Sequence, residues 1–362
     1  VSLMANPDRV ICVNDPETAD LYLGITRFGQ HRSVPGEIVH VVRAGDAPIL
    51  YVIRPDSSYA SDPFFADYPA MYFRRGDVNK LARRLDAALL NYEKVLAFYR
   101  QGVNLGRPIN QLYIRLGNSH HHLEHDEEAM EYYQKALALN PRDEAVYNNI
   151  GVLHMKQKNY QVARGWVQSA LDIHPTYVDA WMNMAELLKM MKDPDGAIEA
   201  YRAALEIEPE SADLHGRLGR FCYQERRFEL AIIHFRKAVQ YKPTSSATHY
   251  NLGLALTGEK SYSEATASFK KAVAIDETFF DGYHGLGAVF MFQHLFEAAK
   301  EAYLKAVALE PRRVDVLSDL GTAYSKLKRF EEARITFEKA LRLQPDHALS
   351  QRRLQELSKL FY

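Results

Sequence analysis

The sequence predicts a mostly α-helical chain, in which a solenoid of seven helix pairs follows a small N-terminal α/β domain. The solenoid is indicated by a spacing of 34 residues that recurs between residues 110 and 347. A proline ends each unit, with Glu277 in its place once: Pro141, Pro175, Pro209, Pro243, Pro311 and Pro345. Two alanine series keep this spacing without a gap: Ala129, Ala163, Ala197, Ala231, Ala265, Ala299 and Ala333, then Ala136, Ala170, Ala204, Ala238, Ala272, Ala306 and Ala340. Stacked helix-turn-helix units produce a period of this kind.

A glycine series and an aromatic series accompany the alanines. Apart from Val167, the aromatic positions hold Tyr133, Tyr201, Phe235, Phe269, Tyr303 and Phe337. Apart from Ala185, the glycine positions hold Gly117, Gly151, Gly219, Gly253, Gly287 and Gly321. A glycine inside a helix costs about 1 kcal/mol relative to alanine. The series therefore indicates positions where two helices cross closely, with the aromatic ring filling the space beside the crossing.

This pattern resembles the tetratricopeptide repeat. The small, large and terminal positions of that family are matched here by Gly151, Trp181, Ala231, Phe235, Ala238, Pro243 and Tyr324. The resemblance implies a right-handed superhelix in which the first helices of the repeats line a concave groove. We expect seven repeats over residues 110–347 and a capping helix over residues 348–362, because an uncapped end would expose apolar surface.

The residues before the repeats have a strand-like spacing of apolar side chains. Short β-branched and aromatic runs predict strands at Val10–Val13, Leu21–Ile25, Ile49–Ile53 and Met71–Phe73. A helix is expected over Val34–Arg43, opened by Pro35, and a longer one over Asp77–Tyr99. Strands that alternate with helices favour a small, mostly parallel α/β domain over residues 1–77. Residues 78–109 would then form a connecting helix and a linker.

Two stretches of this N-terminal segment resemble the nucleotide-binding half of GT-B glycosyltransferases. Val34–Val52 is similar to the helix, turn and strand that carry a glutamate there, and Met71–Leu85 is similar to the next strand, turn and helix. The resemblance implies that Glu37 contacts the donor sugar or its ribose. It supports an alternative function, in which a glycosyltransferase-like or nucleotide-binding protein uses its repeats to recruit substrate.

Composition and charge exclude several classes of protein. Lys and Arg number 45 against 46 for Asp and Glu, so no net charge favours nucleic acid. The longest apolar run, around Ala47–Ile53, is far shorter than the ~20 residues that span a bilayer. We also expect no basic and apolar leader. The two cysteines, Cys12 and Cys222, do not indicate a disulfide framework. We expect a soluble, cytoplasmic protein without a membrane span.

No motif for catalysis or for a cofactor is present in the repeats, so we expect neither enzymatic activity nor a bound cofactor there. The sequence does contain four neighbouring histidines: His120, His121, His122 and His125. His121 and His125 are four residues apart, as metal ligands on one helix face are. The repeat pattern places a turn between these two residues, however, so we predict polar turn residues and no metal site.

The groove of the solenoid is the predicted binding site. The sixth position of successive repeats holds Arg115, Asn149, Asn183, Arg217, Asn251, Gly285 and Asp319. Asparagine side chains both donate and accept hydrogen bonds, which suits an extended peptide backbone, although a solvated helix face also tolerates asparagine. We predict a non-enzymatic scaffold that binds a protein segment through Arg115, Asn118, Asn149, Asn183, Arg217, Arg220 and Asn251. Self-assembly of the solenoid is a third alternative.

Overall fold

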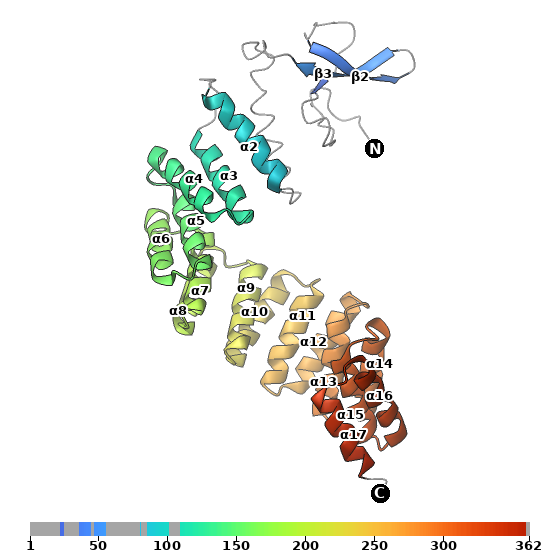
Figure 1. Cartoon of the computed structure of the whole chain (residues 1–362). Coiled ribbons are helices and arrows are strands. Elements are labelled where there is room, and N and C mark those ends of the chain that lie inside the picture. The colour runs from blue at the N-terminus through green and yellow to red at the C-terminus, as the bar shows by residue number, and fades with distance from the viewer. Residues whose placement is uncertain are drawn as a thin grey trace. The chain divides into compact units, whose positions relative to one another are not determined.

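The computed structural model describes residues 22–24, 36–44, 47–55, 80, 85–100 and 109–359 (Figure 1). The chain forms two compact units, Val1–Pro141 and Arg142–Tyr362. Each unit is described separately below.

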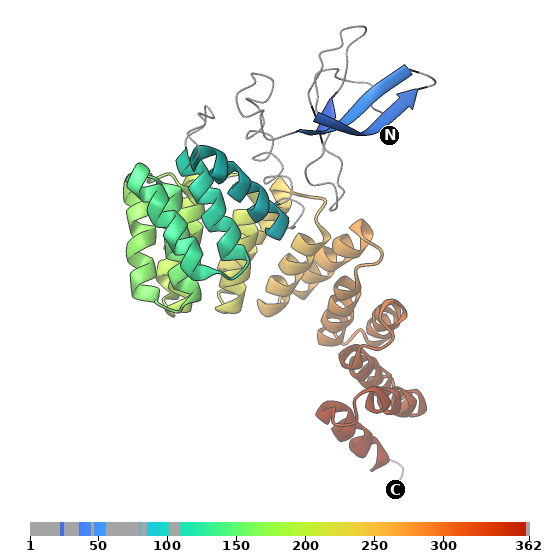
Figure 2. The ribbon, with the colours of Figure 1, turned by 45° about the horizontal axis from the view of Figure 1, so that its top comes forward.

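The described residues contain sixteen helices, and those from α3 to α16 follow one another as seven helix-turn-helix pairs (Figures 1 and 2). We call the first helix of each pair the A helix and the second the B helix. The helices of the first unit are α2 (Leu85–Arg100), α3 (Ile109–His122) and α4 (Asp126–Leu139). Those of the second unit are α5 (Glu144–Lys156), α6 (Tyr160–Ile173), α7 (Val178–Met190), α8 (Pro194–Ile207), α9 (Ala212–Gln224), α10 (Phe228–Tyr241), α11 (Ser246–Gly258), α12 (Tyr262–Ile275), α13 (Phe280–Phe292), α14 (Phe296–Leu309), α15 (Val314–Lys326), α16 (Phe330–Leu343) and α17 (Ala348–Ser358).

The close crossing of the A and B helices is the one that the glycine series predicts. A Cβ atom added to Gly219 in α9 would lie 2.8 Å from the ring of Phe235 in α10. The ring is only 1% exposed, and Ala231 and Ala238 beside it are also buried. Since real Cβ atoms do not come this close to another carbon, glycine at this position is required by packing.

The proline that ends a repeat also helps to fix the start of the next A helix. Its carbonyl oxygen accepts a hydrogen bond from the side chain six residues further on. This bond is 2.8 Å long from Trp181 to Pro175 and 2.7 Å long from Gln351 to Pro345. His215 and His249 make the equivalent contact at 3.0 Å. In these four repeats the proline carbonyl is thereby paired with a side chain of the next helix.

Helices cover the apolar faces at both ends of the repeat array. In the first unit, Tyr92, Val95 and Leu96 of α2 pack on Leu112 and Leu116 of α3. In the second unit α17 packs on α16, and a buried cluster joins Leu357 with Ala333 and Phe337. The predicted capping helix is therefore present, and it ends at Ser358 within the described residues.

The expectation of a helix over Val34–Arg43 is wrong. Residues Gly36–Ala44 form a strand, β2, which pairs antiparallel with β3 (Ala47–Pro55). A third strand, β1 (Tyr22–Gly24), pairs antiparallel with the other edge of β3. The β-branched residues between Ile38 and Val42 favour extended backbone over helix. The described part of this segment is thus an antiparallel sheet without a helix, and not the mostly parallel α/β arrangement expected; Val10–Val13 and Met71–Phe73 lie outside the described residues.

Two glycines of α9 make a matched test of the packing. Gly219→Ala should destabilise the protein by roughly 1 to 3 kcal/mol, because its methyl group overlaps the Phe235 ring. Gly216 has nothing within 4 Å of an added Cβ, so Gly216→Ala should instead stabilise it by about 0.5 to 1 kcal/mol through helix propensity. Urea denaturation of both variants measures the difference, and equal midpoints would contradict the packing argument.

Candidate functional site

The side chains of the A helices form the surface that the groove prediction concerns. In the second unit the A helices are α5, α7, α9, α11, α13 and α15. Consecutive A helices contact each other from α5 to α7 and again from α9 through α11 and α13 to α15. Contact between α7 and α9 is slighter, and the separation of the two neighbouring pairs is visible in Figure 1. We call the half-buried and exposed surface of these helices the A-helix face.

Hydrogen bonds between neighbouring A helices cross this face. The amide of Asn183 in α7 donates to Oδ1 of Asn148 in α5 over 2.9 Å, and Asn148 is only 4% exposed. With the same spacing, Nε2 of His284 in α13 lies 2.8 Å from Oδ2 of Asp319 in α15. Asn183, which was expected to contact a ligand, therefore also joins two repeats. Its removal would leave the buried Asn148 oxygen without this donor, which costs stability.

Glu186 is the centre of a polar cluster on α7. Its Oε1 accepts a hydrogen bond from the hydroxyl of Tyr201 over 2.6 Å, and its Oε2 lies 2.7 Å from Nζ of Lys189. Desolvation raises the pKa of Glu186, but hydrogen bonds from Lys189 and Tyr201 lower it further than burial raises it. The carboxylate is thus charged at neutral pH. Tyr133 and Asn118 form the same kind of bond in the first unit, over 2.6 Å.

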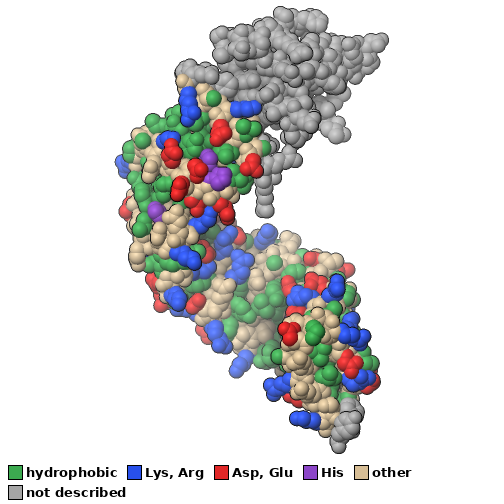
Figure 3. All heavy atoms as spheres, in the orientation of Figure 1, with side chains coloured by type: hydrophobic (Ala, Val, Ile, Leu, Met, Phe, Trp, Pro, Cys, Tyr) green, Lys and Arg blue, Asp and Glu red, His purple; other side chains and the backbone are tan. Residues whose placement is uncertain are grey.

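The other predicted residues of the second unit also lie on the A-helix face. Nε of Arg217 in α9 donates to Asp213 over 2.7 Å, whereas Arg220 is exposed on the same helix. Asn149 and Asn251 are half-buried on α5 and α11. Among the described residues, the Asn251 side chain makes no hydrogen bond, so its amide is available to a ligand. Lys and Arg side chains interrupt the apolar surface of this unit (Figure 3).

Three further predicted residues lie in the first unit. Arg115 and Asn118 are half-buried on α3, the A helix of the first pair. Glu37 lies on β2 rather than at the start of a helix, and its side chain is outside the described residues. Its proposed contact with a nucleotide stays a prediction.

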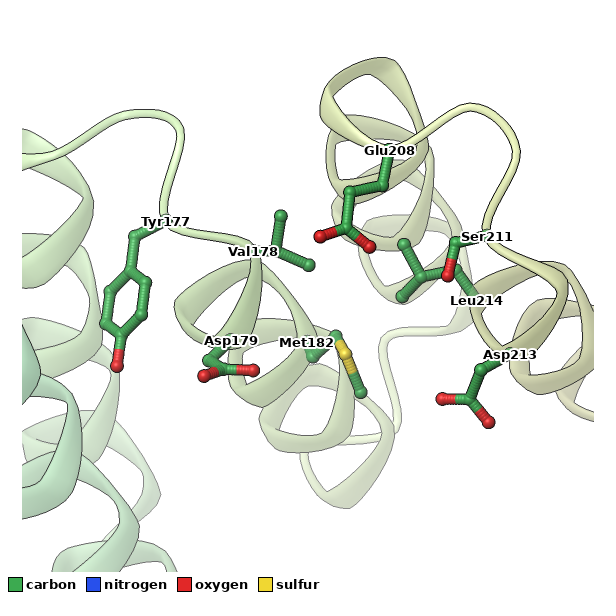
Figure 4. A pocket seen from close by; sticks show the side chains of 8 residues that line it. All are labelled: Tyr177, Val178, Asp179, Met182, Glu208, Ser211, Asp213 and Leu214. Atoms are coloured by element: carbon green, nitrogen blue, oxygen red, sulfur yellow. The ribbon is translucent and has the colours of Figure 1, made fainter. Parts of the chain in front are cut away.

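A pocket of about 350 Å³ opens at the edge of the A-helix face, between the N-terminal ends of α7 and α9. Met182 from α7 and Asp213 from α9 lie on opposite sides of the opening, and Glu208, at the end of α8, points toward Val178 (Figure 4). The complete lining has an apolar part and a carboxylate part: Tyr177, Val178, Met182 and Leu214, then Asp179, Glu208 and Asp213, with Ser211 between them. Sequence analysis missed this pocket, because its lining comes from three separate helices.

Family models match most of the repeat segment. The models described as tetratricopeptide repeat match residues 145–174, 183–247, 246–279 and 314–347, and one described as TPR repeat matches residues 117–158. These matches decide the nature of the repeats. They are tetratricopeptide repeats.

Three solved structures are similar to this chain, and the first has the same fold. The C-terminal part of a TPR repeat-containing protein from Cytophaga hutchinsonii is 20% identical, with 66% of this chain and 97% of that chain covered and a TM-score of 0.57. PilW, a type IV pilus biogenesis factor, is 23% identical over 58% of this chain and 98% of that chain, with a TM-score of 0.49. MamA is 27% identical over 47% of this chain and 93% of its own, with a TM-score of 0.44. A comparison with curated proteins gives no match.

The four neighbouring histidines of the first tetratricopeptide repeat divide between helix and turn. His120, His121 and His122 end α3, and His125 precedes α4; histidine side chains gather on this surface in Figure 3. His120 is 8% exposed and stacks on Tyr132, with ring centroids 5.3 Å apart. Burial lowers its pKa, so the ring is neutral. Over the described residues, no group of three or more His, Cys, Asp or Glu side chains is placed to hold a metal ion.

Two further histidines are joined by a hydrogen bond inside the fourth repeat. Because the Pro209 carbonyl only accepts, neutral His215 carries its proton on Nε2 and accepts at Nδ1. Nδ1 of His234 lies 3.0 Å from that atom and must be its donor. Burial, and then repulsion from His215 when that ring is protonated, lower the pKa of His234 to about 4. The buried thiol of Cys222 is also neutral, since burial raises its pKa to about 11.

None of the helices within the described ranges is both long and apolar enough to cross a membrane.

The histidine pair predicts a loss of stability in mild acid. An unfolded histidine titrates near pH 6.5, whereas folded His234 titrates near 4, so between these values the unfolded chain binds more protons. The free energy of unfolding should fall by about 1 to 2 kcal/mol between roughly pH 7 and roughly pH 5 through this residue. His234→Leu should remove that part of the decrease in urea denaturation. An unchanged pH dependence in this variant would show that the pair does not titrate as described.

Proposed function

We propose that the chain is a protein-interaction scaffold whose A-helix face binds an extended segment of a partner protein. The face is continuous over several tetratricopeptide repeats and mixes apolar side chains with amides and charges. Asn251 carries the proposal, because its half-buried amide makes no hydrogen bond among the described residues and so retains both a donor and an acceptor. An extended peptide backbone offers the complementary pair of groups at each residue.

The charges on the face support the binding of a polar segment. Arg220 is exposed and Lys189 and Arg217 are half-buried, so they can meet carboxylates or backbone carbonyls of a ligand. Exposed ion pairs such as Arg217 with Asp213 contribute little to stability, and exchange with a ligand group would cost little. No described residue supports the alternative of a nucleotide-sugar enzyme, since Glu37 lies on a strand.

A random peptide library displayed on phage and selected with the full chain tests this function. Asn251→Ala should weaken binding of the selected peptides by about threefold to tenfold, because one backbone hydrogen bond contributes roughly 0.5 to 1.5 kcal/mol. Folding should hardly change, since the substituted amide has no partner in the fold. Isothermal titration calorimetry measures the affinity.

Gln240→Ala in α10 is the matched control. This amide is exposed on a B helix, so its removal should leave the affinity unchanged. Equal affinity of the parent and Asn251→Ala, with both folded by circular dichroism, would contradict recognition by the A-helix face. Light scattering of the unbound chain would show whether self-association competes with the peptide.

A further inference from the structure

The pocket between α7 and α9 has a counterpart three repeats further on, at the start of α15. There an arginine of the chain itself occupies the position of Ser211. The guanidinium of Arg313 lies over the ring of Phe280, with 4.5 Å from Cζ to the ring centroid. Its Nε and Nη2 lie 3.1 and 2.7 Å from the two carboxylate oxygens of Asp315, and its Nη1 lies 3.3 Å from Glu310. Two carboxylates and one ring therefore hold a guanidinium at this junction.

The backbone of the two junctions is the same. Ser211 has φ −70° and ψ 102°, and Arg313 has φ −78° and ψ 106°. The amide nitrogen of Ser211 bonds to the carbonyl of Glu208 over 3.2 Å, and that of Arg313 to the carbonyl of Glu310 over 3.3 Å. The side chain at residue 211 therefore starts toward the pocket in the direction that the Arg313 side chain takes.

The junction at Ser211 has the same two carboxylates as the junction at Arg313. It lacks the arginine and the phenylalanine ring. Glu208 and Asp213 stand at the positions of Glu310 and Asp315. Ser211, by contrast, ends after one side-chain oxygen, which makes no capping bond. The smaller Val178 stands where the second junction has Phe280. The pocket of about 350 Å³ lies at the first junction, where both of these side chains are smaller.

The carboxylates of the pocket have unused capacity to accept hydrogen bonds. Glu208 and Asp179 form no ion pair with any described residue. Asp213 uses Oδ2 to bind Arg217 over 2.7 Å, and this pair is partly exposed. The pocket thus combines negative charge with the apolar surface of Met182 and Leu214, which suits a cation on an aliphatic stem.

We propose that this pocket binds the arginine side chain of a partner's extended segment. The inference rests on the function proposed above and specifies one residue of the ligand. Arginine is favoured over lysine because its planar fork can bond to two carboxylates at once, as Arg313 does with Asp315 and Glu310.

A capped arginine, N-acetyl-arginine amide, is the probe for the test. The methyl signal of Met182 in the full chain, assigned with Met182→Leu, should shift on titration with this compound. N-acetyl-citrulline amide has the same shape without the charge, and it should need at least about a tenfold higher concentration, since charge-assisted hydrogen bonds are lost. Nα-acetyl-lysine amide, which keeps its charged ammonium group, should need a concentration between those of the arginine and citrulline compounds.

Variants at residue 211 test whether capped arginine binds inside the pocket or shifts the Met182 signal from elsewhere. Ser211→Arg should fill the pocket from within, as Arg313 does, and abolish the shift caused by capped arginine. Ser211→Gln adds a side chain without a charge and should retain measurable binding. Arg313→Ser should open the second junction, so that capped arginine then also shifts the signals of His284, which stands at the position of Met182.

Equal shifts with the arginine and citrulline compounds, or full binding to Ser211→Arg, would overturn the inference. If peptides selected from the library depend on Asn251 but carry no arginine, the scaffold function stands and the pocket assignment falls. If capped arginine binds but Asn251→Ala has no effect on selected peptides, the pocket is confirmed and the function of the A-helix face is not.

Discussion

The close approach of the two helices in each repeat is the constraint on which the structure depends. Where the A-helix glycine faces the B-helix ring, as Gly219 faces Phe235, no further atom fits. The same contact recurs in five of the seven repeats, whereas Gly151 faces Val167 in the second repeat and Ala185 stands at the glycine position in the third. Packing therefore determines the glycine, alanine and aromatic positions, and leaves the outer positions of the A helices free to vary. Those outer positions form the candidate binding face.

Sequence variation at the turns before the A helices coincides with the pocket at the edge of the A-helix face. The positions held by Ser211 and Arg313 are equivalent, and both have nearly the same backbone angles. At one junction an arginine satisfies the local carboxylates, and at the other a serine leaves them with a pocket. Repetition thus supplies an internal comparison, in which one copy of a site shows which chemical group another copy is suited to bind.

The repeats and their packing could be predicted from sequence, because each depends on short-range spacing that seven copies reinforce. The pairing of Asn183 with Asn148 could not, since it depends on the distance between two A helices. The strand at Gly36–Ala44 replaces the helix expected there: the proline before it is typical of a helix start, but its β-branched residues favour extended backbone. The pocket could not be predicted from sequence, because its lining comes together only in three dimensions. The sequence does show that Arg313 stands at the repeat position of Ser211.

Photo-crosslinking tests most directly whether the A-helix face recognises the partner. A benzophenone amino acid placed at residue 251, on α11, or at residue 240, on α10, would be irradiated with a peptide selected by the chain. Recognition by the A-helix face predicts a crosslink from residue 251 and none from residue 240. A crosslink from residue 240 alone would place the partner on the B helices and contradict the account.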